Sequence, residues 1–135
     1  MTQQLILHND VQQIEQLAEY IDSIAEATNI DPSLALSLNL ALEEAVTNVV
    51  MYAYPEGTDG TVEIITQADN HLLTFIIKDS GIPFDPTQKE DADTTLSAEE
   101  RPIGGLGIFL VKQIMDEVAY KHEDGQNILT MTKKL

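Results

Sequence analysis

The chain has 135 residues, of which 43% are hydrophobic, and its 23 acidic and 7 basic side chains give a net charge of −16. A chain of this length is expected to fold as one domain, 1–135, and to bury roughly two-thirds of its unfolded surface. The negative charge argues against nucleic acid and anionic membranes as partners, because both would be repelled. The absence of cysteine excludes disulfides and thiolate metal sites. We find neither an apolar run long enough to span a bilayer nor a secretory signal, and therefore expect a cytoplasmic protein.

The first part of the chain predicts an edge strand followed by two helices. Residues 3–8 form a short apolar run, and the Asn-Asp pair at 9–10 offers a helix cap. Apolar residues then recur at helical spacing over 11–25. The Asp-Pro pair at 31–32 combines an N-cap residue with proline in the first turn, which predicts a second helix through about residue 53.

The second part predicts two hairpins separated by a loop and a helix. Period-two patterns at 61–67 and 72–79 indicate the first hairpin, and 117–134 the second. Apolar positions over 108–118 predict a third helix. The charged stretch 86–103 is either a plain linker or a lid over a site, and its length favours a lid. The element order predicts an α+β fold, a two-layer α/β sandwich in which a mixed, mostly antiparallel sheet is covered by three helices.

Two polar side chains flank the apolar face of the second predicted helix. Glu44 and Asn48 are four residues apart around the run AVTNVV, so a helix places both on one stripe. Because carboxylates and amides are rarely buried without partners, this stripe must meet either a solvent-filled cleft or a ligand. Glu43 lies about 100° around the helix and is expected to be a solvated neighbour.

Two glycine-containing segments complete the pattern of a magnesium nucleotide pocket. Asp79 and Gly81 follow a strand in KDSGIPFDP, and Gly104, Gly105 and Gly107 open a helix in PIGGLGIFLV. A dinucleotide-binding fingerprint fits poorly, because these glycines follow a charged loop and not a first strand. A P-loop is excluded, because no glycine is followed by Lys and then Ser or Thr. Taken alone, the glycines are equally well explained as a loop end that permits close helix packing.

The order of these motifs resembles the GHKL ATPase superfamily, which groups gyrase, a heat-shock chaperone, histidine kinases and a mismatch-repair protein. The likeness is to its small single-domain branch, the anti-sigma-factor serine kinases, and covers essentially the whole chain. EEAVTNVVMYAY is similar to their N box, DSGIPFDP to their first glycine box, and RPIGGLGIFLVKQIMDEVAY to their second. The resemblance implies a Bergerat-type ATP-binding fold that binds ATP or ADP with Mg²⁺. As partners it implies an anti-sigma-factor antagonist as substrate, a sigma factor, and a second copy of the chain in a homodimer.

The resemblance also assigns roles to residues of the first two motifs. Glu44 would be the general base that accepts a proton from the attacking hydroxyl, and Asn48 would be the Mg²⁺ ligand, through a neutral amide oxygen. Asp79 would accept a hydrogen bond from the adenine amino group. Gly81 would let the backbone approach the base.

Further roles follow for the glycine-rich segment and the last strand. The backbone N–H groups of residues 104–107 (Gly104, Gly105, Leu106 and Gly107) would meet the phosphates at a helix N-terminus. Arg101 would contact the γ-phosphate, with a surface ion pair to Glu99 or Glu100 as the alternative. Many relatives carry Gly-Thr-Thr where this chain reads GQNILTMT, so Asn127 is expected to replace a threonine near the adenine.

The sequence therefore predicts an ATP-dependent serine/threonine kinase of the anti-sigma-factor type. A second hypothesis is a protein-binding regulator that is switched by the nucleotide without significant phosphotransfer. A third is an interaction domain with a vestigial pocket. A sensor histidine kinase is disfavoured, because the chain offers no segment for the histidine-bearing dimerisation helices that such enzymes place upstream.

Overall fold

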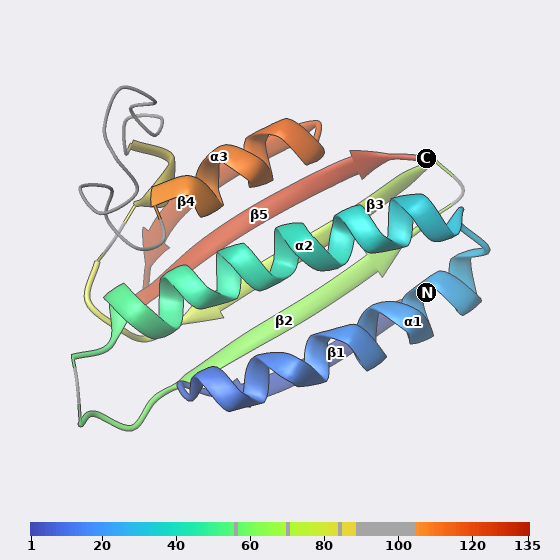
Figure 1. The fold of residues 1–135 in the computed structure, drawn as a ribbon. Helices are drawn as coiled ribbons and strands as arrows, with labels where there is room; N and C mark the ends of the chain where they lie inside the picture. Colours follow the sequence, from blue (N-terminus) through green and yellow to red (C-terminus); the bar gives the residue numbers. More distant parts are fainter. Residues whose placement is uncertain (56, 70, 84, 89–104) are drawn as a thin grey trace.

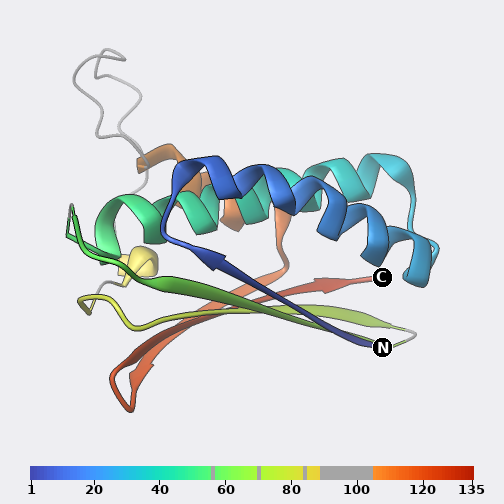
Figure 2. The same ribbon diagram turned by 90° about the horizontal axis from the view of Figure 1, so that it is seen from below.

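The chain folds into a five-stranded sheet with three α-helices packed on one face (Figures 1 and 2). The structure is a computed structural model that describes residues 1–55, 57–69, 71–83, 85–88 and 105–135. The strands are β1 (Thr2–His8), β2 (Thr61–Ala68), β3 (Leu72–Asp79), β4 (Glu117–Glu123) and β5 (Gln126–Lys134). The α-helices are α1 (Gln16–Thr28), α2 (Pro32–Asn48) and α3 (Gly105–Ile114). This arrangement confirms the predicted α+β sandwich of two layers.

The strand order is β1-β2-β3-β5-β4, and every hydrogen-bonded pair of neighbouring strands in the described chain is antiparallel. We expected a mixed, mostly antiparallel sheet, whereas the described strands form an antiparallel sheet. The connection from β3 through α3 leads to β4, which runs parallel to β3, but β5 lies between these two strands and pairs with both. The parallel pair is thus separated by an inserted strand.

Local signals at the helix ends act as the sequence predicts. A short 3₁₀ helix, Val11–Glu15, precedes α1, and the side chain of Asp10 caps it by accepting a hydrogen bond from the Gln12 N–H. Helix α1 ends where Asn29 adopts the left-handed conformation, with φ of 55°. The Asp31 side chain caps α2 by accepting from the Ser33 N–H at 2.9 Å, with proline in the first turn.

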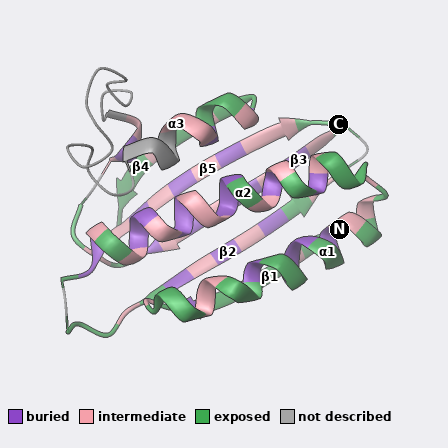
Figure 3. Cartoon of the chain, viewed as in Figure 1, coloured by how far each residue is buried: buried purple, intermediate pink, exposed green. Residues whose placement is uncertain are grey.

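Helix α2 continues into a π-helical segment, Val49–Ala53. The continuous run Pro32–Ala53 has a mean hydropathy of 1.3 and is long and apolar enough, by length and composition only, to cross a membrane. The expectation that the sequence contains no such run is wrong on this criterion. The physical reason for its apolar character is visible in the fold, because α2 lies across the middle of the sheet and supplies the core (Figure 3).

Helix α3 is shorter than its apolar pattern suggests. It ends at Ile114, whose carbonyl accepts a hydrogen bond from the Lys133 ammonium at 2.9 Å. The Asp116 N–H already pairs with the Thr132 carbonyl of β5. Val118, which was expected on the helix, therefore belongs to β4, because strand pairing with β5 replaces helical hydrogen bonding.

The last hairpin turns at Asp124 and Gly125, which have φ of 54° and 78°. Positive φ at both central residues is what a two-residue type I′ turn requires, and Asp-Gly is a preferred pair there. The turn fixes the register in which Glu123 faces Gln126 and His122 faces Asn127. This register determines which side chains of β4 and β5 reach the helix-covered face.

A buried hydrogen bond joins the first helix to the sheet. The hydroxyl groups of Tyr20 on α1 and Thr66 on β2 lie 2.6 Å apart, and Thr66 is fully buried. We predict that Tyr20→Phe and Thr66→Val each lower the free energy of unfolding by about 1–3 kcal/mol, because each leaves the other hydroxyl buried without its partner. Urea unfolding at constant m-value measures this loss.

The double variant provides the control for this prediction. Since it removes both hydroxyl groups together, its loss of stability is expected to be smaller than the sum of the two single losses. Strictly additive losses would show that the hydroxyl pair contributes no coupling.

Candidate functional site

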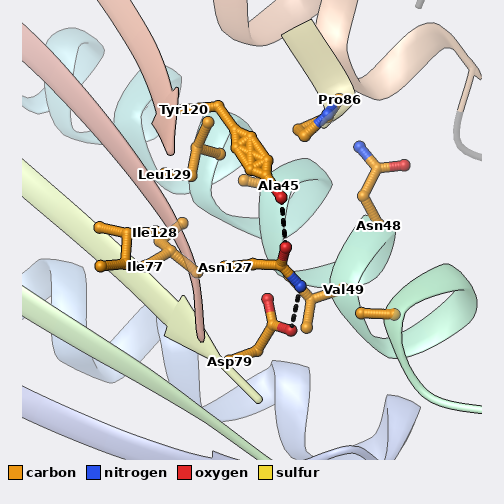
Figure 4. Close-up of a pocket in the computed structure, with 11 residues that line it drawn as sticks. Ala45, Asn48, Val49, Ile77, Asp79, Pro86, Tyr120, Asn127, Ile128 and Leu129 are labelled. Atoms are coloured by element: carbon orange, nitrogen blue, oxygen red, sulfur yellow. Dashed lines mark hydrogen bonds between the residues drawn. The ribbon is translucent and has the colours of Figure 1, made fainter. Parts of the chain in front are cut away.

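Several elements converge at the end of the sheet where α2 finishes. They enclose a narrow cavity of about 20 Å³ between the last turns of α2, the end of β3 and the start of β5 (Figure 4). Its lining residues are Ala45, Asn48, Val49, Ala53, Ile77, Asp79, Pro86, Tyr120, Asn127, Ile128 and Leu129. Three of the predicted site residues, Asn48, Asp79 and Asn127, therefore meet in one cavity although they come from different elements.

The polar wall of the cavity is a chain of three side chains. The Asn127 amide nitrogen donates to Asp79 Oδ1 at 2.9 Å, and the Tyr120 hydroxyl donates to the Asn127 amide oxygen (Figure 4). The same amide nitrogen also donates to the Ile82 carbonyl at 2.8 Å. These bonds fix the amide orientation of Asn127, because a carboxylate and a carbonyl can only accept while the hydroxyl donates.

The carboxyl group of Asp79 is almost completely buried, with 4% of the residue exposed. Burial raises its pKa above the ordinary value of 3.8, and the hydrogen bonds from Asn127 and from the Gly81 N–H oppose this rise. The charge of His122 also acts to lower this pKa, and a buried acid with a perturbed pKa at a cavity is a candidate functional group.

Gly81 occupies a position that admits no side chain. A Cβ atom at this residue would lie 2.2 Å from the Ala53 carbonyl oxygen. The adjacent Ile82 N–H donates to that same oxygen at 2.7 Å. The glycine thus lets the loop after β3 pack directly against the π-helical end of α2, and this contact brings Asp79 next to the cavity.

Asn48 carries a buried polar atom that has no hydrogen-bond partner among the described residues. The residue is 3% exposed, and the atom is the amide oxygen Oδ1. A buried amide oxygen without a partner costs free energy in the absence of a ligand. Such an oxygen suits a hydrogen-bond donor or a hard cation, and a Mg²⁺ ion held by one protein oxygen, water and phosphate oxygens is a common arrangement.

Glu44, unlike Asn48, Asp79 and Asn127, is not among the residues that line the cavity. It precedes Asn48 by one helical turn and is half-buried. Glu43, expected to be solvated, is also half-buried and accepts a hydrogen bond from the Asn39 amide nitrogen at 3.3 Å. The general-base role of Glu44 stays a prediction.

The glycine-rich segment is only partly described. Helix α3 begins at Gly105 and includes Leu106 and Gly107, and it starts at the end of the sheet where α2 finishes (Figures 1 and 2). Gly104 and Arg101 lie outside the described residues. Of the expected lid at 86–103, Pro86–Gln88 form a 3₁₀ helix, and the remainder also lies outside the described part of the chain.

The volume of the cavity limits what it can hold in this conformation. About 20 Å³ accommodates roughly one water molecule, far less than a purine ring. Pro86 lines the cavity opposite Asp79 and Asn127 (Figure 4). Entry of a base would therefore require a displacement of the walls, which include the 3₁₀ segment that carries Pro86.

Two contributors were missed by the sequence analysis. Tyr120 orients Asn127, and Ala53 provides the carbonyl oxygen that holds the loop after β3. Alternation along β4 places Tyr120 on the same face as Val118, so its inward direction was available from the sequence. The contact with Asn127 also depended on the register of the hairpin, which the Asp-Gly turn sets.

Comparisons with known proteins identify the family to which the chain is similar. The family described as "Histidine kinase-like ATPase domain" matches residues 7–133. The serine/threonine-protein kinase BtrW of Bordetella bronchiseptica is 27% identical over 84% of this chain and 80% of its own length. The serine-protein kinase RsbW of Bacillus cereus is 31% identical over 71% of this chain, but the match spans only 61% of RsbW.

Solved structures extend the likeness to the fold. A chain of the SiaB-SiaC complex from Pseudomonas aeruginosa aligns with a TM-score of 0.53 at 17% identity, over 97% of this chain and 89% of that one. The mycobacterial sensor histidine kinase MprB aligns with a TM-score of 0.53 at 16% identity, over 96% and 97%. At these identities the likeness concerns the fold alone.

The contact between Gly81 and Ala53 leads to a stability prediction. We expect Gly81→Ala to lower the free energy of unfolding by about 3 kcal/mol, because the new Cβ must displace backbone. Gly57→Ala is the matched control: it meets no atom within 4 Å, and its φ of 83° costs only about 1 kcal/mol. Equal losses in urea unfolding would contradict the close approach at Gly81.

Burial of Asp79 leads to a prediction on pH. Because its pKa is raised in the folded state, its contribution to stability is complete below the unfolded value near 3.8 and is lost as pH rises through the folded pKa. We expect the stability of Asp79→Asn relative to the native protein to increase as pH rises from acidic towards neutral, and then to level off. Urea unfolding of both proteins across this pH range measures the difference between their free energies of unfolding. The contributions of the other titratable groups are common to both proteins and cancel in this difference. A difference that does not change with pH would show that Asp79 ionises as freely in the folded as in the unfolded protein.

Proposed function

The chain belongs to the family of histidine kinase-like ATPase domains, and from this we propose that it is an ATP-dependent serine/threonine kinase of the anti-sigma-factor type. Membership of this family implies ATP binding, and the curated relatives BtrW and RsbW are named as serine or serine/threonine protein kinases. The proposed substrate is a hydroxyl group of a small anti-sigma-factor antagonist protein. Sequestration of a sigma factor, a homodimeric state and a cytoplasmic location are further parts of the proposal.

The observation that carries this proposal is the pairing of Asn48 and Asp79 in one cavity. Asn48 offers a buried amide oxygen without a partner, and Asp79 offers a buried carboxyl group held by Asn127. The first suits the metal that accompanies a nucleotide, and the second suits the amino edge of adenine. Bound Mg²⁺ would neutralise negative charge on the phosphates during transfer.

Recognition of adenine would depend on the order of donors and acceptors along the polar wall. Asp79 Oδ1 already accepts from the Asn127 amide and from the Gly81 N–H. These two donors hold the carboxyl group in place, so that it presents acceptor capacity to an exocyclic amino group. Guanine presents a carbonyl oxygen at the equivalent position, and two acceptors facing each other are unfavourable.

Phosphate binding would depend on backbone groups more than on side chains. Among the described residues that line the cavity there is no Lys or Arg. The first N–H groups of α3, from Gly105 onwards, have no partners within the helix and carry the positive end of its dipole. Arg101 is proposed to add a guanidinium at the γ-phosphate.

In the transfer step, Glu44 would accept the proton of the serine or threonine hydroxyl as its oxygen attacks the γ-phosphorus. The bond from the γ-phosphorus to the bridging oxygen breaks, and ADP leaves with that oxygen. The helical spacing places Glu44 one turn from Asn48, on the same stripe of α2. The base and the metal ligand would thus be aligned by a single rigid element.

A second candidate function is a nucleotide-switched regulator that binds a protein without significant phosphotransfer. One observation favours it: Glu44 does not line the cavity that contains Asn48 and Asp79. In that case the nucleotide would control only the shape of the protein surface. The two candidates share the same binding residues and differ in the role of Glu44.

Glu44→Gln separates the two candidates. For a kinase, we expect this variant to retain Mg-ATP affinity within about twofold and to lose transfer by roughly 10²- to 10⁴-fold, because only the proton acceptor is removed. Transfer is measured with γ-labelled ATP and the antagonist-like protein of the same organism, and affinity by calorimetry. Glu43→Gln is the matched control on the same helix and should keep full activity.

Two results would overturn this assignment. Equal transfer by the native protein and Glu44→Gln would remove Glu44 from the chemistry. Absence of transfer by the native protein, with Mg-ATP binding intact, would support the regulator instead.

A further inference from the structure

A second concave surface lies between α1 and α2, towards the end of α1 and the start of α2. It is an apolar groove of about 420 Å³, which we call the α1–α2 groove. Both helices line it with residues at spacings of three, four and seven. The lining residues are Ala18, Ile21, Asp22 and Ala25 of α1, Pro32, Ala35, Leu36 and Asn39 of α2, and Ile30 between the helices.

This pattern is the one by which a helix pair receives a third helix. Residues at i, i+3, i+4 and i+7 form a continuous stripe on a helix, and two such stripes side by side make a groove between ridges. The floor is formed by Ile21 and Ala35, which are 2% and 8% exposed. The short side chains of Ala18, Ala25 and Ala35 leave space between the two helices, so a third helix could approach closely.

The rim of the groove exposes apolar surface to solvent. Leu36 is 72% exposed and Leu40, four residues later on the same side of α2, is 40% exposed. Burying a leucine side chain against a partner is favourable, because it removes apolar surface from water. Two exposed leucines one helical turn apart next to an apolar groove are typical of a surface that binds an amphipathic helix.

The charge around the groove is of one sign. The chain contains no Lys or Arg before Lys78, so neither α1 nor α2 carries a basic side chain. Their acidic residues are Glu19, Asp22, Glu26, Glu43 and Glu44. This potential repels a second copy of the acidic α1–α2 face and repels anionic lipid, and it attracts a positively charged segment.

The polar atoms in the groove accept hydrogen bonds. Asp22 contributes a carboxylate, and Asn39 Oδ1 is buried without a partner among the described residues. The amide orientation of Asn39 is set by Glu43, because the Asn39 nitrogen donates to that carboxylate at 3.3 Å. Asp22 and Asn39 thus offer acceptor oxygens on this surface, and the side chains of lysine and arginine supply donors without adding acceptors.

We propose that the α1–α2 groove is a docking surface for an amphipathic helix of a partner protein, with leucine-like residues on one face and Arg or Lys beside them. Leu36 and Leu40 would pack against the apolar face, while Asp22 would contact the basic flank directly and set the orientation. Glu26 carries the same charge on the same helix but lies outside the lining of the groove, so it is not part of the contact.

This surface is separate from the nucleotide cavity. Asn39 and Asn48 are nine residues apart on α2, which is about 13 Å along the helix axis. Helix α2 thus presents the groove near its start and the cavity at its end. Binding of a partner helix does not require the nucleotide site, and the two proposals can fail independently.

The test uses a fluorescent peptide of about 18 residues, long enough to form a helix on a surface. Its leucines follow the i, i+3, i+4 and i+7 spacing and are flanked by arginines. A scrambled peptide of the same composition, with the leucines spread over all faces, has the same charge without an apolar face. Anisotropy at about 0.15 M salt screens long-range attraction and measures the affinity of the full chain for each peptide.

We expect the amphipathic peptide to bind at least about tenfold more tightly than the scrambled one. Leu36→Asn should weaken binding by about tenfold, because a buried leucine contact is lost. Asp22→Asn should weaken it by up to about fivefold. Each of these variants has a matched control that should change the affinity less than twofold. The control for Leu36→Asn is Ile6→Asn, at a 57% exposed position on β1, and the control for Asp22→Asn is Glu26→Gln on α1.

Two results would overturn the docking surface. Equal binding of both peptides would reduce the effect to net charge, and unchanged binding by Leu36→Asn would place the contact elsewhere. Leu36 and Asp22 are exposed, so both variants are expected to fold, which unchanged circular dichroism would verify. A native protein that binds the amphipathic peptide selectively but not Mg-ATP would support this surface while contradicting the proposed kinase.

Discussion

The buried carboxyl group of Asp79 is the constraint on which the architecture of the site depends. It lies at the last residue of β3, and it is held from two sides, by Asn127 of β5 and by the N–H of Gly81. Gly81 in turn packs against the Ala53 carbonyl at the end of the α2 run, where the Ile82 N–H also donates. One carboxyl group thereby links the sheet, the loop after β3 and the end of the main helix. A change at any of these three contacts would alter the shape of the cavity.

Helix α2 carries both surfaces because it is the central element of the helical layer. Its buried side covers the sheet through residues such as Leu38 and Leu42. At its end it turns Asn48 into the cavity, and near its start it borders the α1–α2 groove. One continuous helix therefore borders both the cavity and the α1–α2 groove, about one-half of its length apart from each other.

Much of this fold was predictable from particular residues. Asp10, Asn29 and Asp31 mark the helix ends by local chemistry, and the Asp-Gly pair sets the last turn. Such signals act within a few residues, so they survive in the sequence without knowledge of the fold. Val118 was placed on a helix because apolar spacing continued past Ile114, whereas pairing with β5 had already replaced the helix. Tyr120 was missed because its contact with Asn127 depends on the register of two strands.

The sequence by itself determined most of the helices and strands and the identity of the polar residues that interrupt apolar patterns, because periodicity and capping are local properties. Only the tertiary structure decided that Asn48, Asp79 and Asn127 share one cavity while Glu44 stays outside its lining. It alone also brought the stripes of α1 and α2 together as a groove. The physical reason is that these features depend on distances between elements far apart along the chain, and those distances are fixed by packing against the sheet.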